Sequence, residues 1–144
     1  MMHDFLESNL DNFNLNQKDV DQYSPLVLAY IGDAVYEVFV RTLLVCEENT
    51  TVHKLHKRST DFVKAKAQSD TVHRIMEFLT PEEQDIVRRG RNAKSGTVPK
   101  NAVVTEYKYA TGFESLIGFL YLKKNHSRLM QILRISILKN ENQV

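Results

Sequence analysis

Hydrophobic residues recur at every third or fourth position along most of the chain, which is the spacing that places side chains on one face of an α-helix. No stretch of useful length alternates between apolar and polar residues, as a half-buried β-strand does. Only 5 Gly and 3 Pro interrupt the pattern in 144 residues. The sequence therefore predicts an all-α domain without strands.

The first long helix is predicted from about Pro25 to about Val45. Ser24 can cap its amino end, and proline suits the first helical position because the amide hydrogen that it lacks would be unpaired there. The residues before this helix run polar and acidic. We therefore separate a polar N-terminal segment, residues 1–23, from a single domain that takes up residues 24–144.

Three helices are expected in the middle of the chain. The stretch Asn49–Thr51 can cap a short helix through Leu55, and the cluster Ser59–Asp61 can start a longer one that reaches toward Phe78. The run Thr80–Glu83 has the form of a capping box with proline in the first turn. It predicts a helix that continues into the basic residues that follow.

A loop and two helices complete the chain. Residues 92–103 contain Gly, Pro, Ser, Asn and Lys and are predicted to form a basic loop. A helix is expected from near Thr105 to just before Lys123, followed by an amphipathic helix over Leu129–Leu138. No internal repeat or linker indicates a second domain.

The composition fits this single domain. With 42% hydrophobic residues, the chain can bury one core without disulfides. Cys46 is the only cysteine, which excludes an intramolecular disulfide and a cysteine-based zinc cluster and suits a reducing compartment. The first two dozen residues lack the apolar core of a secretion signal or a membrane span. We therefore expect a cytoplasmic protein without a membrane partner.

The charges are unevenly distributed along the chain. A net charge of +1 does not by itself indicate a nucleic-acid binder. Five basic residues and no acid nevertheless occur between Ile86 and Thr105. They can bind phosphates, or they can form a solvated helix end, where cations are favourable. The five are Arg88, Arg89, Arg91, Lys94 and Lys100.

Asp33 is the first residue that suggests chemistry. It lies in the middle of an apolar helix, where a carboxylate without a partner is costly. A backbone cap or a salt bridge would satisfy it as well as a metal ion would. Glu37, four residues on, adds a second negative charge to the same face. Repulsion between the two acids tips the balance toward a bound cation, although Glu37 also fits a solvated rim position.

Glu114 is a second acid embedded in an apolar helix. Small residues near both acids, Ala29 and Gly32 on one helix and Gly118 on the other, would let the two backbones approach closely. The carboxylates of Asp33 and Glu114 would then meet without a nearby His or Cys. Such an oxygen-only pair suits Mg²⁺, which keeps several of its waters and can activate a nucleophile beside a phosphate.

The two acids lie in motifs that resemble those of the ribonuclease III family. The run Leu28–Val35 (LAYIGDAV) resembles the signature helix of that family, and Ala110–Gly118 (ATGFESLIG) resembles its second acidic helix. Their separation, the short chain and the intervening Arg89–Lys94 (RGRNAK) resemble mini-ribonuclease III, a catalytic domain without the usual double-stranded-RNA-binding domain. The likeness extends from about Pro25 to about Ser136.

The resemblance assigns roles to single residues. It makes Asp33 and Glu114 the catalytic acids that hold Mg²⁺ at the scissile phosphate. Two further acids of the full-length family are replaced here by Ala29 and Thr111, a reduction that the mini-ribonuclease III group resembles. It also places Tyr30 in the interface of a homodimer, although ordinary core packing would explain that tyrosine equally well.

By the same resemblance, the expected activity is Mg²⁺-dependent hydrolysis of double-stranded RNA, leaving a 5′-phosphate and a 3′-hydroxyl. The basic residues and the basic loop would contact the RNA. The implied natural substrate is the precursor of 23S ribosomal RNA, with a ribosomal protein as a candidate helper. The main alternative is an inactive ribonuclease III fold that binds RNA or assists ribosome assembly, with Ala29 and Thr111 as marks of decay. A third is a helical dimerisation domain whose basic patch binds a protein.

Overall fold

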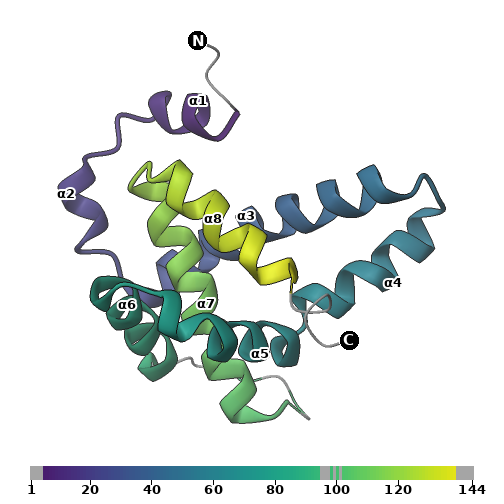
Figure 1. Ribbon diagram of the computed structural model, residues 1–144. Helices are drawn as coiled ribbons and strands as arrows, with labels where there is room; N and C mark the ends of the chain where they lie inside the picture. Colours follow the sequence, from purple (N-terminus) through teal and green to yellow (C-terminus); the bar gives the residue numbers. More distant parts are fainter. Residues whose placement is uncertain (1–4, 95–97, 99, 101, 139–144) are drawn as a thin grey trace.

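Every regular element in the described part of this computed structural model is a helix (Figure 1). The structure describes residues 5–94, 98, 100 and 102–138. The all-α prediction is confirmed for these residues. Their elements are α1 (Phe5–Asp11), α2 (Gln17–Val20), α3 (Pro25–Glu47), α4 (Val52–Val63), α5 (Ala65–Ile75), the 3-10 turn η1 (Met76–Phe78), α6 (Pro81–Asn92), α7 (Val104–Leu122) and α8 (His126–Ile137).

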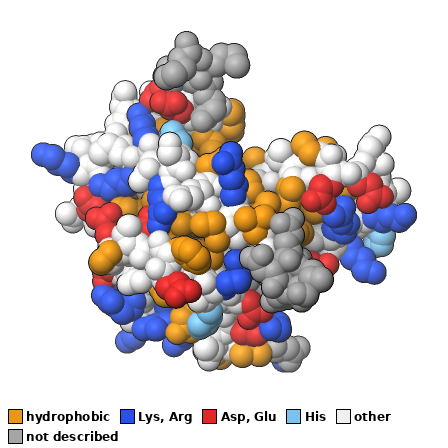
Figure 2. Space-filling view, in the orientation of Figure 1, with side chains coloured by type: hydrophobic (Ala, Val, Ile, Leu, Met, Phe, Trp, Pro, Cys, Tyr) orange, Lys and Arg blue, Asp and Glu red, His pale blue; other side chains and the backbone are white. Residues whose placement is uncertain are grey.

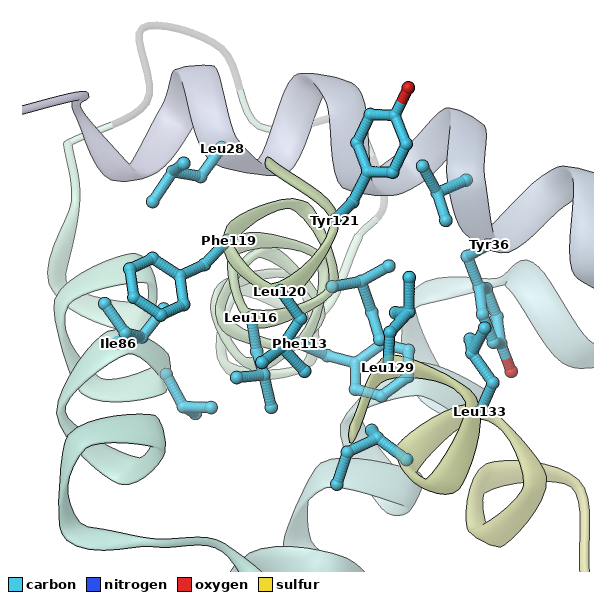
Figure 3. Close-up of a cluster of buried hydrophobic side chains, with 14 of the residues drawn as sticks. Leu28, Tyr36, Ile86, Phe113, Leu116, Phe119, Leu120, Tyr121, Leu129 and Leu133 are labelled. Atoms are coloured by element: carbon cyan, nitrogen blue, oxygen red, sulfur yellow. The ribbon is translucent and has the colours of Figure 1, made fainter. Parts of the chain in front are cut away.

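Helix α7 runs through the middle of the fold, with α3, α5, α6 and α8 packed around it (Figure 1). Every residue from Ala110 to Tyr121 except Glu114 is buried. A helix that is apolar on all sides has to be covered on all sides, which explains the central position of α7. Figure 3 shows its side chains pointing outward in several directions, with Phe119 directed toward Ile86 of α6 and Phe113 toward α8.

Helices α3 and α7 touch through their backbones. A Cβ atom built on Gly32 would lie 1.8 Å from the carbonyl oxygen of Glu114. A Cβ atom built on Gly118 would lie 1.9 Å from the carbonyl oxygen of Leu28. Both distances are far shorter than any real contact, so only glycine fits at either position. The close approach predicted from small residues near the two acids is confirmed.

Replacement of Gly118 by alanine is expected to destabilise the fold by about 3 kcal/mol or more, because the new methyl group would force two packed backbones apart. Alanine is otherwise the better helix former by about 1 kcal/mol, so the steric effect opposes the intrinsic preference. Urea unfolding followed by circular dichroism measures the change. An unfolding midpoint equal to or above that of the wild type would contradict the backbone contact.

Most of the predicted helix ends are found. Ser24 caps α3 by accepting a hydrogen bond from an amide of its first turn. Thr80 and Glu83 form the predicted capping box of α6, with both hydrogen bonds present. Helix α8 begins at His126, ahead of the predicted Leu129, because Asn125 supplies a cap there. The predicted loop of residues 92–103 is non-helical wherever it is described beyond α6.

The helix break predicted at Ser59–Asp61 is wrong. Helix α4 continues through this cluster to Val63. The hydroxyls of Ser59 and Thr60 donate to the carbonyl oxygen of His56 at 2.8 and 3.1 Å, so they bond within α4 instead of capping a new helix. The chain turns at Lys64, whose extended backbone separates α4 from α5.

The polar segment of residues 1–23 contains two helices that its pattern does not predict. Leu10 of α1 and Val20 of α2 are buried among the core residues. The side-chain amide of Gln17 donates to the carbonyl oxygen of Leu122 at 3.0 Å. This segment therefore packs against the carboxyl end of α7.

Figure 2 shows how side chains are distributed on one face of the molecule. Hydrophobic side chains reach the surface along α8 in the middle of this face, and Lys and Arg side chains gather over α6 (Figure 2). No helix in the described part of the chain is long and apolar enough to span a bilayer.

Candidate active site

Asp33 and Glu114 line one hollow where α3 crosses α7. Asp33 is exposed on α3, directly after the glycine whose missing side chain admits the backbone of Glu114. Glu114 is partly buried within the most apolar stretch of α7. The structure therefore brings together the two acids that the sequence singles out.

The carboxyl group of Glu114 has a strongly raised pKa. Burial, followed by the charge of Asp33 and a hydrogen bond with it, raises the pKa of Glu114 to about 9, and the more distant charge of Glu37 adds to the rise. Only a hydrogen bond from Gln68 acts in the opposite direction. Without a cation, Glu114 therefore holds a proton at neutral pH. A carboxyl group with a strongly shifted pKa in an open hollow is typical of a functional site.

Glu37 lies one turn beyond Asp33 on α3 and is half-buried. Its Oε2 atom accepts a hydrogen bond from Nε of Arg41 at 3.0 Å. This ion pair satisfies Glu37 without a metal ion. The residue contributes negative charge to the site, and its role as a rim acid is the one that the contacts favour.

The donor set of the site consists of oxygen atoms. In the part of the chain that the structure describes, no three His, Cys, Asp or Glu side chains come together to hold a metal ion. Asp33 and Glu114 could supply two oxygen ligands, and the open hollow around them leaves room for water. Two carboxylates with free water positions fit a hard divalent cation better than zinc, which takes three or four nitrogen or sulfur ligands.

The two positions at which the resemblance to the ribonuclease III family implies further acids also line this hollow. Ala29 and Thr111 both belong to its wall. The hydroxyl of Thr111 donates to the carbonyl oxygen of Tyr107 at 3.0 Å, inside helix α7. Neither residue can add negative charge, so the site holds fewer acids than the resemblance implies for the full-length family.

Gln68 of α5 is a site residue that sequence reasoning missed. Its side chain is 1% exposed, and its amide hydrogen bond to Glu114 lowers the pKa of that carboxyl group. A single glutamine in a polar stretch of helix carries no sequence signal. Only the packing of α5 against α7 reveals that Gln68 belongs to the site.

Three of the five predicted RNA-binding residues, Arg88, Arg89 and Arg91, lie on α6, which packs against α7. A Cβ atom built on Gly112 of α7 would lie 2.6 Å from the carbonyl oxygen of Val87, so α6 and α7 are also in backbone contact. Arg88 and Arg89 are exposed on α6, and Arg88 pairs with Asp85 one turn earlier. Lys94 and Lys100 are also exposed.

The side chain of Arg91 is held by Tyr109, which the sequence does not predict. Its guanidinium donates to the hydroxyl of Tyr109 at 3.2 Å and lies 5.5 Å from the centre of that ring. The Tyr109 ring in turn packs against His73, with ring centres 4.1 Å apart. Arg91 therefore joins α6 to the first half of α7, and it would bring a fixed positive charge to this surface.

Tyr30 is 83% exposed, which excludes the core position that the sequence left open. Val27, Ala34, Val38 and Val45 lie on the same face of α3 and are exposed as well. Together they form an apolar face on α3 that no element of the described chain covers. Tyr30 also lines the hollow that holds the two acids.

Comparison with known proteins identifies the same region. The profile of the Ribonuclease III domain matches residues 26–125. A protein of Thermoanaerobacter named Mini-ribonuclease 3 is 53% identical over 129 residues, covering 89% of this chain and 91% of the relative. Proteins of the same name from Clostridium tetani and Staphylococcus aureus are 49% and 44% identical, covering 84% and 88% of this chain and 81% and 98% of their own.

A solved structure shares the fold. An X-ray crystal structure of a protein from Fusobacterium nucleatum superimposes with a TM-score of 0.76 at 35% sequence identity. The match covers 85% of this chain and 98% of that one. The helical arrangement described above is therefore the arrangement of an experimentally determined relative.

Proposed function

Because this chain belongs to the ribonuclease III family, in its mini-ribonuclease group, we propose that it is an endoribonuclease that cleaves double-stranded RNA with Mg²⁺ at Asp33 and Glu114. The observation that carries the proposal is the pairing of these acids in one hollow, with burial and the charge of Asp33 raising the pKa of Glu114 to about 9. A buried carboxyl group that holds a proton beside a second acid can exchange this proton for a cation.

Asp33 and Glu114 would both be ligands of the same ion. Exposed Asp33 and partly buried Glu114 would hold the ion together, and Glu114 would have to lose its proton to act as a ligand. The backbone contact between α3 and α7 at Gly32 fixes the relative position of both side chains, so little reorganisation accompanies binding. When bound, Mg²⁺ supplies an activated water and offsets negative charge on the phosphate. We infer products with a 5′-phosphate and a 3′-hydroxyl.

We propose that the basic residues of α6 and the loop after it bind the phosphates of an A-form duplex. Such contacts position RNA by backbone and shape instead of by sequence. Exposed Arg89, Lys94 and Lys100 are available for this role, whereas Arg88 pairs with Asp85 and Arg91 forms a hydrogen bond with Tyr109. Affinity that depends on such phosphate contacts should fall steeply as the salt concentration rises.

We propose that the apolar face of α3 is the interface of a homodimer with Tyr30 in its centre. Replacement of Tyr30 by arginine is expected to leave single chains, since it places a charge where apolar side chains would pack. Light scattering coupled to size-exclusion chromatography measures the mass. Phe78→Arg is the matched control, because Phe78 is 60% exposed on η1, next to α8. A dimer that persists in Tyr30→Arg would place the interface elsewhere.

The natural substrate that we propose is the precursor of 23S ribosomal RNA, processed in the cytoplasm, with a ribosomal protein as a candidate helper. The resemblance to mini-ribonuclease III motivates this assignment. The competing candidate is an inactive RNA-binding or ribosome-assembly module, which the loss of acidic side chains at Ala29 and Thr111 favours. Retention of both Asp33 and Glu114 in one hollow favours the enzyme.

The experiment that tests the function compares an end-labelled RNA duplex with the same strand alone, each with Mg²⁺ or with EDTA. We expect cuts in the duplex only, and only with Mg²⁺. Binding of the duplex without cleavage, on plain RNA and on a structured ribosomal precursor alike, would support the inactive module. Equal cleavage of the single strand would contradict the proposed substrate class.

A further inference from the structure

Gln68 connects three parts of the fold at the site. Its side chain is 1% exposed on α5. Its Nε2 atom donates to the carbonyl oxygen of Val63, the last residue of α4, at 3.1 Å. An amide nitrogen has two hydrogens, and the second is available to the carboxyl group of Glu114 on α7, whose pKa Gln68 lowers. The amide nitrogen therefore joins α5 to α4 beside the acid.

The oxygen of the same amide has no partner. In the described part of the chain, only Oε1 of Gln68 and the two ring nitrogens of His126 are buried side-chain atoms without a hydrogen bond. Neither residue lines the hollow itself, but Gln68 lies close enough to Glu114 to lower the pKa of that acid, whereas His126 begins α8. Buried carbonyl oxygens in native proteins almost always find a donor, and an exception next to a site indicates a water or an ion.

The proposed function supplies a donor for Oε1 of Gln68, namely a water molecule bound to Mg²⁺. A Mg²⁺ ion with two carboxylate ligands keeps several waters, each of which needs an acceptor for its hydrogens. Because Ala29 and Thr111 supply no acid, more of those waters remain than in a site with four acids. A neutral amide oxygen can accept from such a water without adding to the repulsion between Asp33 and Glu114.

We propose that Oε1 of Gln68 accepts a hydrogen bond from a water of the bound ion's hydration shell while its Nε2 atom orients Glu114. Gln68 is then a positioning residue. It holds a water of the bound ion in a site that lacks further acids. This inference rests on the proposed function, since it requires a hydrated cation at Asp33 and Glu114. It assigns a role to a neutral residue outside both acidic motifs.

Two substitutions at this position separate the oxygen from the nitrogen. Gln68→Met keeps the length of the side chain and removes both polar atoms. Gln68→Glu restores an oxygen that can accept from water but cannot donate to Val63. Gln84→Met is the matched control, because the Nε2 atom of Gln84 donates to the carbonyl oxygen of Met76 at 2.9 Å, in a part of the fold that does not line the site.

Isothermal titration of each RNA-free protein with Mg²⁺ at pH 8 gives the affinity directly. We expect Gln68→Met to bind Mg²⁺ roughly 10- to 100-fold more weakly than the wild type, while Gln84→Met is unchanged. We expect Gln68→Glu to bind no more weakly than the wild type. Unfolding midpoints measured without metal show whether each variant is folded.

The outcomes distinguish this inference from the proposed function. Failure of the wild type to bind Mg²⁺ overturns both. Binding by the wild type with an unchanged affinity in Gln68→Met overturns the role of Gln68 alone. If Gln68→Met does not fold, the Mg²⁺ affinity of Gln68→Glu tests the role of Gln68 instead. Weakened binding in Gln68→Glu would mean that Gln68 acts only as a structural tie through its nitrogen.

Discussion

Asp33→Asn and Glu114→Gln are each expected to slow the cleavage of duplex RNA by roughly 10³-fold or more. Loss of the cation removes several kcal/mol of charge stabilisation from the transition state, which corresponds to a factor of this size. Both variants should remain folded. Since burial and the charge of Asp33 raise the pKa of Glu114 to about 9, the metal-free protein already holds this side chain in a neutral form at pH 7, which glutamine imitates.

Glu37→Gln is the matched control for these two variants. Glu37 contributes negative charge to the site, but its carboxylate is engaged by Arg41 at 3.0 Å. We expect a loss of less than about tenfold, as for a charge that acts from outside the ligand set. Single-turnover cleavage of an end-labelled duplex measures all three variants. A loss in Glu37→Gln equal to that in Glu114→Gln would mean that Glu37 is also a ligand.

The second large effect is a pH dependence of metal binding. With the pKa of Glu114 raised to about 9 by burial and by Asp33, its proton competes with the cation at every pH below 9. Binding of one ion should release one proton, so Mg²⁺ affinity should rise roughly tenfold per pH unit up to that pKa and then level off. Between pH 6 and pH 9 the total change should approach roughly a thousandfold.

The rise in melting temperature with added Mg²⁺, recorded at several pH values, measures this dependence. The midpoint Mg²⁺ concentration should fall as the pH increases. Glu114→Gln, which has no proton to release, should lose this dependence together with most of its affinity. A wild-type midpoint that stays constant from pH 6 to pH 9 would mean that Glu114 is ionised before the metal binds.

Much of the site could be predicted because its residues are unusual for the helices in which they lie. Asp33 and Glu114 are carboxylates in apolar helices, where they need a partner. Gly32 and Gly118 are poor helix formers in long helices, which indicates a close approach of backbones. The helix starts at Ser24 and Thr80 depend on cap chemistry that is local as well.

The features that sequence reasoning missed are set by packing between distant segments. Gln68 has no local anomaly, and its importance comes from the contact of α5 with α7. Ser59 fits a cap and a helix interior equally well in sequence, and the continuous packing of α4 selects the interior. Leu10 and Val20 are single apolar residues in a polar segment, and their burial depends on the end of α7 being open to receive them.

The exposure of Tyr30 illustrates a third case. An aromatic residue in an apolar helix fits a core and an interface equally well in sequence. In the structure α7 covers one face of α3, and Tyr30 lies on another. Only the arrangement of the helices separates the two roles, and it leaves this face free for a second chain.

The most direct test of a shared metal site at Asp33 and Glu114 is a count of bound ions by electron paramagnetic resonance. Mn²⁺ replaces Mg²⁺ as the probe because both prefer oxygen ligands, and its signal is lost on binding. We expect one ion per chain in the wild type at pH 8, and no binding in the same concentration range by folded Asp33→Asn or Glu114→Gln. Equal binding by the wild type and both variants would place the metal elsewhere and contradict the account.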